Sequence, residues 1–355
     1  MSKEKRGIDL LRELCLEFGP SGCEERVASR ILENIEGTYD ELIDDRMGGV
    51  IAVVRGNGTS DKRVMLSCHM DEVGFMVRHI EDSGLLRFSS MMGSDTRIMA
   101  GRRVTVGDGE RLVRGVIAMK PVHLVGREDR DKSASMDELY IDIGASSKEE
   151  AEKYVKKGDF GTFESDFVIF GEDDKYIKAK AIDDRIGCSI MCDLMHALKE
   201  RDEKVPFDVY FAFTCREELG LSGARCASHK IRPHMAIIFE ATAVADIHGV
   251  PEISRVAKRG EGGAVSIMDR STIYDRDLTD HLLETAKKHD IPVQVKKYVS
   301  GGNDAGHIHK AADGCKCAVI SVPACYIHTA SNVIAKCDYE SIYELALNSL
   351  IDLEV

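Results

Sequence analysis

A histidine and an aspartate stand two residues apart at the end of a predicted strand. The apolar residues 64–66 are typical of a buried strand, and the sequence CHMDEVGF follows at 68–75. Because side chains at positions i and i+2 of an extended chain point to the same side, His69 and Asp71 are expected to share one pocket. A carboxylate often accepts the second ring N–H of a metal-bound histidine. The pair therefore indicates either a metal ligand with its orienting carboxylate or a buried histidine beside a turn aspartate.

Other side chains that bind metals follow further apolar strands or precede a helix. Taken singly, each has a simpler interpretation as a helix cap, a solvated helix start or a loop carboxylate. These residues are Asp183 in AIDDRIG, Glu217 and Glu218 in TCREELG, Glu240 at the end of MAIIFE, and His328 after AVISVPA.

The joint placement of these residues favours a metal site, because ligands collect where the strands of an α/β sheet end. Two histidines and several carboxylates suit Zn²⁺, Co²⁺ or Mn²⁺. Two metal ions about 3.5–4 Å apart need a bridging carboxylate, for which Asp183 is the natural candidate. One histidine and one glutamate then remain for each ion. The glutamate left over is the expected general base, which takes a proton from a metal-bound water and passes it to the leaving amine.

The elements that must position these residues predict an α/β fold. Two helices at 8–17 and about 24–36 precede two short strands at 40–56, with Ser21 as N-cap and Glu24 closing a capping box. After about residue 176, helices and strands alternate to the end. The predicted elements are helices at 186–200, 219–229, 275–289, 303–312 and 338–352, and strands at 207–213, 235–240, 263–268, 292–298 and 317–322.

Residues 71–167 have a different texture, with short β-rich pieces separated by Gly, Asp and Ser turns and one predicted helix at 147–157. This pattern predicts a small β-barrel or sandwich. The expected organisation is therefore an α/β domain with a mixed sheet, formed by residues 1–70 and 168–355, which is interrupted by an inserted β domain at 71–167.

The net charge, the apolar stretches and the cysteine count limit which partners the protein can bind and in which compartment it can lie. The 355-residue chain has a formal net charge of −13, which argues against nucleic acid or an anionic membrane surface as partner. No apolar stretch is long enough to span a bilayer. The start of the chain is charged and then amphipathic, unlike a signal peptide. Eleven cysteines without zinc-finger spacing fit free thiols, so we expect a cytoplasmic protein.

Several motifs in the same order resemble the cytosolic two-metal aminopeptidases that include the tetrahedral (TET) and bacterial glutamyl aminopeptidases, some of which have been labelled endoglucanases. The resemblance covers almost the whole chain. Its motifs are GPSGCEE at 19–25, HMDEVGFMV at 69–77, LYIDIGASS at 139–147, AIDDRIGC at 181–188, REELGLSGA at 216–224, SGGNDAG at 300–306 and YIH at 326–328.

The resemblance implies a zinc-peptidase-like catalytic domain that holds two divalent metal ions and acts on peptides. It implies Asp183 as the bridging ligand, with Glu218 and His328 completing one site and His69 and Glu240 the other. Glu217 would be the general base and Asp71 the residue that orients His69. The family often assembles dimers into a hollow dodecamer, so a homo-oligomer built through the β domain is expected.

The chain departs from the family pattern at four positions. Glu240 replaces a common Asp, Cys325 replaces an Arg, Asn332 replaces a Glu, and Asn303 stands in a Gly-Gly-Thr-Asp motif in place of Thr. The change at 240 preserves a metal ligand, whereas the other three are expected near the substrate pocket and bear on specificity.

Three other functions are compatible with parts of the sequence. An N-acyl amino acid deacylase would use the same two metal ions. A glycoside hydrolase would use Glu217 and Glu218 as acid and base, but it would leave both histidines and Asp183 without a role. A binding or scaffold protein on this fold would not take up metal.

Overall fold

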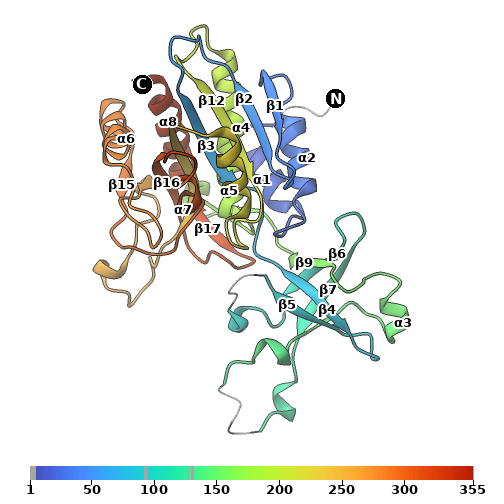
Figure 1. Ribbon diagram of the computed structural model, residues 1–355. Helices are drawn as coiled ribbons and strands as arrows, with labels where there is room; N and C mark the ends of the chain where they lie inside the picture. Colours follow the sequence, from blue (N-terminus) through green and yellow to red (C-terminus); the bar gives the residue numbers. More distant parts are fainter. Residues whose placement is uncertain (1–4, 92–94, 127, 129–131, 355) are drawn as a thin grey trace.

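The site residues predicted above lie in or near the strands of a mixed eight-stranded sheet. The computed structural model describes residues 5–91, 95–126, 128 and 132–354 (Figure 1), so residues 1–4 of the charged initial segment lie outside the described part. The sheet has the strand order β1-β2-β12-β3-β13-β16-β14-β15. Its strands are β1 (Glu41–Asp44), β2 (Val50–Val54), β3 (Arg63–His69), β12 (Asp208–Thr214), β13 (Met235–Ala243), β14 (Gly263–Val265), β15 (Val293–Val295) and β16 (Lys316–Ala324).

Alternating side chains along each strand build a separate core on either face of the sheet. In β2, Val50, Ala52 and Val54 belong to the larger core, while Ile51 and Val53 belong to the smaller one. Helices α1 (Gly7–Leu16), α2 (Glu25–Asn34), α4 (Ile182–Glu200), α6 (Arg276–Lys288) and α8 (Lys336–Asp352) cover the larger core, and α5 (Ser222–Ile231) and α7 (Ala305–Ile308) cover the smaller one. The predicted α/β fold with a mixed sheet is therefore confirmed.

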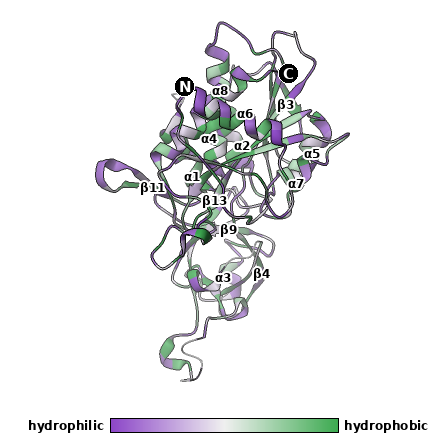
Figure 2. Ribbon diagram, turned by 90° about the vertical axis from the view of Figure 1, so that its left-hand side faces the viewer, coloured by the Kyte–Doolittle hydropathy of each residue, from purple (hydrophilic) through white to green (hydrophobic). Residues whose placement is uncertain are grey.

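The helices around the sheet are amphipathic. Figure 2 shows hydrophobic and hydrophilic residues together on them, as expected for helices with one face on a core and one in water. Within the described ranges, none of the helices combines the length and the apolar character that crossing a lipid bilayer requires.

The segment predicted as β-rich forms a closed six-stranded barrel, which lies as a separate lobe below the sheet in Figure 1. Its neighbours run in the order β4-β5-β8-β7-β6-β9. Gly161 allows the barrel to close, because a Cβ atom at this position would lie 2.0 Å from the aromatic ring of Phe75. The strands are β4 (Phe75–Ile80), β5 (Leu86–Ser90), β6 (Arg103–Gly107), β7 (Leu112–Ala118), β8 (Tyr140–Asp142) and β9 (Phe160–Phe163).

The helix predicted at 147–157 is much shorter in the structure. It forms α3 (Lys148–Ala151), after which the chain turns and places Val155 in the barrel core. Ala151 and Val155 are both buried in that core. The chain therefore turns after Ala151 to bury Val155, and the last two turns of the predicted helix do not form.

A small second sheet was absent from the sequence-based prediction. It pairs β10 (Val168–Phe170), β11 (Tyr176–Ala179) and β17 (Asn332–Ala335), all antiparallel. This sheet ties the chain that returns from the barrel to the segment just after His328. The strand β11 ends four residues before Asp183, so the small sheet positions both of these candidate ligands.

The capping box predicted before α2 is wrong. The helix begins at Glu25, and Glu24 is its N-cap residue without a side-chain capping bond. The Ser21 hydroxyl donates a hydrogen bond to the Asp71 carboxylate, and the Glu24 carboxylate accepts from the peptide N–H groups of Gly22 and Arg216. Each of these side chains therefore has a partner in a distant part of the chain, and neither caps the helix that follows.

Candidate metal centre

Four adjacent parallel strands bring the predicted ligands to one edge of the sheet. The strands β12, β3, β13 and β16 are neighbours and run in the same direction, so their carboxyl ends meet. His69 is the last residue of β3, Glu217 and Glu218 follow β12, and His328 follows β16. This is the edge at which α/β sheets collect ligands.

Glu240 lies inside a strand rather than at its end. The strand β13 continues to Ala243, three residues beyond the predicted end. Its pairing with β3 stops at Ile238, whereas its pairing with β16 continues. Glu240 therefore lies two residues beyond the last β13 residue that pairs with β3, and its carboxylate reaches Nε2 of His69, the last residue of β3.

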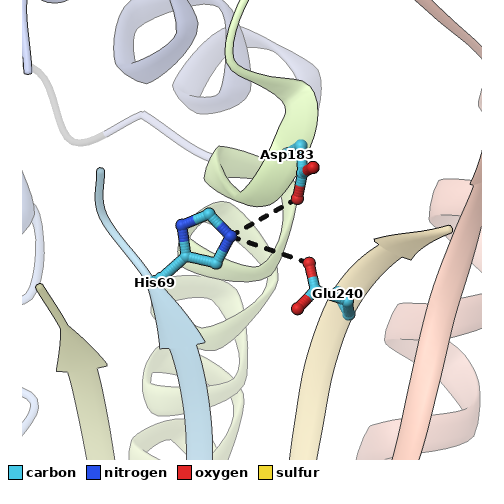
Figure 3. A group of neighbouring side chains, drawn as sticks. All are labelled: His69, Asp183 and Glu240. Carbon is cyan, nitrogen blue, oxygen red and sulfur yellow. Dashed lines mark ion pairs between the residues drawn. The ribbon is translucent and has the colours of Figure 1, made fainter. Parts of the chain in front are cut away.

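His69, Asp183 and Glu240 form the first of two groups of possible metal ligands (Figure 3). The Nε2 atom of His69 lies 3.4 Å from Oδ1 of Asp183 and 3.6 Å from Oε1 of Glu240. One ligand atom from each residue lies within 4.8 Å of the others. The three side chains come from β3, the start of α4 and β13, and they converge on one point.

Asp183, Glu218 and His328 form the second group, so Asp183 belongs to both. The Nε2 atom of His328 lies 3.4 Å from Oδ2 of Asp183 and 3.6 Å from Oε1 of Glu218. The two oxygens of Asp183 thus face different imidazoles. At its place in the first turn of α4, Asp183 has non-helical backbone angles, and the peptide bond to Asp184 is cis.

Glu217 belongs to neither group but reaches the first one. Its Oε2 atom lies 4.0 Å from Nε2 of His69, and its side chain is only 10% exposed. Burial raises its pKa well above the usual range, and the negative charges of Glu240 and Asp304 act in the same direction, although His69 acts in the opposite one. A carboxylate with a raised pKa beside the ligand groups is suited to accept and return a proton.

Asp71 makes contacts different from those expected. The Nδ1 atom of His69 is hydrogen-bonded to the backbone oxygen of Asp71 at 3.0 Å, whereas the carboxylate Oδ1 atom lies 3.6 Å away. That carboxylate accepts from the peptide N–H groups of Glu217 and Glu218 at 3.0 and 3.1 Å, and from Ser21. Because Nδ1 is held by an acceptor, Nε2 presents its lone pair to Asp183 and Glu240.

The electrostatics of the two groups suit cations. Burial, reinforced by the charge of Asp183, raises the pKa of Glu218 to about 7 and that of Glu240 to about 8. Although burial favours a neutral ring, the neighbouring Asp183 raises the pKa of His328 to about 9. Because burial and the charge of Asp183 both disfavour the ionised form of these glutamates, a cation between them would favour it.

The side chains of the two groups fit divalent metal ions on geometric grounds as well. Within the described part of the chain, Oδ1 of Asp183 and Oε1 of Glu218 are buried without a hydrogen-bond donor. Buried carboxylate oxygens are rarely left unpaired, because each loses its hydration. Imidazole nitrogen and carboxylate oxygen are ligand types that zinc, cobalt and manganese accept.

Two further buried carboxyl groups near the site were missing from the sequence-based set. Asp304 is 1% exposed and accepts from the Thr214 hydroxyl at 2.6 Å, and Asp184 is fully buried and accepts from the Gly187 N–H at 3.1 Å. The only sequence signal for them was their presence in the motifs SGGNDAG and AIDDRIGC.

Asn332 supports the loop that carries His328. Its side-chain amide donates to the backbone oxygens of Tyr326 and Thr329 at 3.3 and 3.0 Å, and the side chain is 1% exposed. Asn303 donates to the Tyr274 hydroxyl at 3.0 Å. Both departures from the family pattern thus serve to hold loops together.

Comparison with known proteins gives one family. Residues 48–345 match the M42 glutamyl aminopeptidase family. The chain is 31% identical to a lysyl aminopeptidase of Pyrococcus furiosus, with 98% of this chain and 97% of that protein covered.

Solved structures of the same kind agree with the fold. A TET aminopeptidase from the marine sediment archaeon Thaumarchaeota archaeon SCGC AB-539-E09 has a TM-score of 0.94 at 33% identity, with 98% and 96% of the two chains covered. The TET1 peptidase of Pyrococcus horikoshii, described as assembling into a tetrahedron or a large octahedral shell, has a TM-score of 0.87 at 31% identity, with 98% and 99% covered.

Proposed function

The chain belongs to the M42 glutamyl aminopeptidase family, and we propose that it removes N-terminal residues from peptides at a site for two divalent metal ions. The observation that carries the proposal is the sharing of Asp183 between two ligand groups, each with one histidine and one glutamate. His69, Asp183 and Glu240 would hold one ion, and Asp183, Glu218 and His328 the other. Zinc suits this donor set best, and cobalt and manganese are also compatible with it.

When bound, the two metal ions would supply the positive charge that polarises the scissile carbonyl and acidifies the attacking water. Glu217 accepts a proton from that water as the water oxygen bonds to the scissile carbonyl carbon, and it delivers this proton to the amine nitrogen as the C–N bond breaks. Its side chain is only 10% exposed and its Oε2 atom lies 4.0 Å from Nε2 of His69, which supports this role beside the ligand groups. Asp71 fixes the backbone on which Glu217 stands, and its carbonyl oxygen holds the His69 ring.

The test replaces Glu217 with Gln in the full chain. Hydrolysis of aminoacyl anilides should then fall by about 10²–10⁴ in kcat because the proton acceptor is lost. The metal content per chain, measured by inductively coupled plasma mass spectrometry, should stay unchanged, since Glu217 belongs to neither ligand group. A matched control is Glu203→Gln at an exposed glutamate, which should retain full activity.

Two outcomes would contradict the proposal. Undiminished hydrolysis by the Glu217→Gln variant would refute the assignment of the base. Cleavage of N-acylated amino acids in preference to substrates with a free amine would identify a deacylase instead of an aminopeptidase.

We also propose how the chain is organised. Residues 1–70 and 168–355 would form the catalytic domain, and residues 71–167, which include the closed barrel, would form an inserted domain for assembly and access. The assemblies described for the TET1 peptidase of Pyrococcus horikoshii support a homo-oligomer, up to a dodecamer built from dimers. All eleven cysteines are free thiols, which supports a reducing cytoplasmic location.

A further inference from the structure

The loop that carries Glu217 is held by its backbone N–H groups. Three successive peptide groups donate to buried carboxylates: Arg216 to Glu24 at 3.0 Å, Glu217 to Asp71 at 3.0 Å and Glu218 to Asp71 at 3.1 Å. The loop lies between the end of β12 and the start of α5 at Ser222, so neither element supplies acceptors for these groups. Buried N–H groups require acceptors.

The backbone of this loop also departs from regular geometry. Arg216 has a φ of 55°, a left-handed conformation that costs free energy for a residue other than glycine. Such a conformation persists only where the surroundings determine it. The hydrogen bond from the Arg216 N–H to Glu24 acts directly on this residue.

The segment that supplies Glu24 is itself fixed in place. The Glu24 carboxylate is 4% exposed and also accepts from the Gly22 N–H at 2.8 Å, while the Ser21 hydroxyl donates to Asp71. The Ser21 N–H donates to the backbone oxygen of Glu72 at 3.3 Å, so the segment is anchored to the chain that follows Asp71. Two neighbouring residues of one segment thus hold the loop, one directly and the other through Asp71.

From these contacts we propose that Glu24 and Ser21 are positioning residues that set the place of the general base Glu217. Glu24 fixes the peptide group that precedes Glu217, and Ser21 fixes the carboxylate that holds the next two. Both residues lie in the motif GPSGCEE at 19–25, which precedes residues 48–345 that match the family model. The role of Glu217 as base rests on the proposed function, whereas the anchoring of its loop does not.

The experiment uses the full chain with Glu24→Ala, and Glu24→Gln as the conservative variant. Loss of the acceptor at residue 24 should lower kcat about 10–100-fold with KM and metal content unchanged, as for other residues that support a ligand shell. The Gln variant retains a carbonyl oxygen for the Arg216 N–H and should keep kcat within about threefold of wild type, well below the loss of about 10–100-fold expected for the Ala variant. The matched control is Glu25→Ala, because Glu25 is the same residue type at the next position but is exposed.

Hydrogen–deuterium exchange of the peptide 214–221 gives a readout independent of activity. In the metal-free protein, exchange in this peptide should be faster for Glu24→Ala than for wild type, Glu24→Gln and Glu25→Ala. If kcat stays unchanged in Glu24→Ala, whether or not exchange rises, the positioning role is refuted. An inactive wild type would refute the proposed function, and exchange would still decide whether Glu24 holds the loop.

Ser21→Ala provides a second variant should Glu24→Ala fail to fold. It removes only a hydroxyl donor from the Asp71 carboxylate, and it should lower kcat while leaving KM and the melting temperature near those of wild type. A wild-type kcat in this variant would overturn the part of the proposal that concerns Ser21.

Discussion

At the scale of single residues, the proposed binding of two ions depends on Asp183. Its two oxygens lie 3.4 Å from the Nε2 atoms of two different histidines, which themselves come from β3 and from the loop after β16. A carboxylate that faced only one imidazole would support a single ion. The proposed mechanism therefore depends on this residue more than on any other ligand.

Glu72, the residue after Asp71, has a structural role. The Glu72 carboxylate is ion-paired with the buried side chains of Lys180 and Arg185, and it accepts from the Thr162 hydroxyl of β9 at 2.8 Å. Lys180 and Arg185 flank Asp183 in sequence, and Thr162 lies in the last strand of the barrel. One carboxylate thus links the barrel to the segment that carries Asp183.

Replacing Glu72 with Gln is expected to destabilise the protein by about 3–5 kcal/mol, because two buried cations lose their counter-charge. Urea unfolding monitored by circular dichroism measures this change. The matched control is Glu81→Gln, which breaks the more exposed pair with Arg87 and should cost only about 0–1 kcal/mol. Equal effects of the two substitutions would contradict this account of Glu72.

At the scale of elements, the sequence predicts the helices and strands of the large sheet because their apolar periodicity is strong. It does not predict β10, β11 and β17, which are three or four residues long, and β11 pairs with β17 across more than 150 residues of sequence. Short strands of this kind depend on partners that no local pattern reveals.

The capping box shows that partners distant in sequence also limit the prediction of single side-chain contacts. Ser21 and Glu24 satisfy the local capping pattern, yet Ser21 donates to Asp71, and Glu24 accepts from Arg216 as well as from the nearby Gly22. The types of the ligands and their positions near strand ends could be predicted from the sequence. Their distances, the sharing of Asp183 and the amide contacts of Asp71 depend on how four strands and a helix start meet in space, so they could not.

Helix α8 holds a neighbouring loop in a way that depends on pH. The Asp338 carboxylate accepts from the N–H groups of Gly260 and Gly262, both at 2.8 Å, and burial raises its pKa to about 6. Between about pH 4 and 6, the folded state therefore binds more protons at this group than the unfolded state. The stability that this group contributes falls as the pH rises through that window.

The stability of wild type relative to Asp338→Asn should accordingly fall by about 3 kcal/mol between pH 4 and pH 7, since about two pKa units separate the folded and unfolded states. Urea unfolding of both proteins across this range tests the expectation. The exposed Asp313→Asn serves as control and should show no such trend. A constant or rising difference for Asp338→Asn would contradict the assigned direction.

At the scale of the whole molecule, the barrel presents apolar side chains to solvent on the segment 119–126 after β7, which we call the arm. Val122 is 55% exposed and Leu124 is 66% exposed. Apolar residues exposed together on a projecting arm are typical of an interface. This agrees with the proposal that the barrel mediates assembly.

Wild type should therefore have a solution mass that is a multiple of 39.3 kDa, up to twelve chains. The double substitution of Val122 and Leu124 by Glu should lower that mass without lowering the melting temperature, because both side chains are exposed. Light scattering after size-exclusion chromatography measures the mass, with Leu16→Glu on the exposed face of α1 as control. A monomeric wild type, or a double variant with unchanged mass, would rule out this role of the arm.

The count of metal ions per chain tests the central claim most directly. The protein is treated with a chelator, dialysed, and titrated with Zn²⁺ by calorimetry, and elemental analysis gives the bound metal. Wild type should bind two ions per chain, Glu218→Gln should lose tight binding of one, and Asp183→Asn should lose tight binding of both. A wild type that binds fewer than two ions, or an Asp183→Asn variant that keeps one tight site, would contradict the shared ligand.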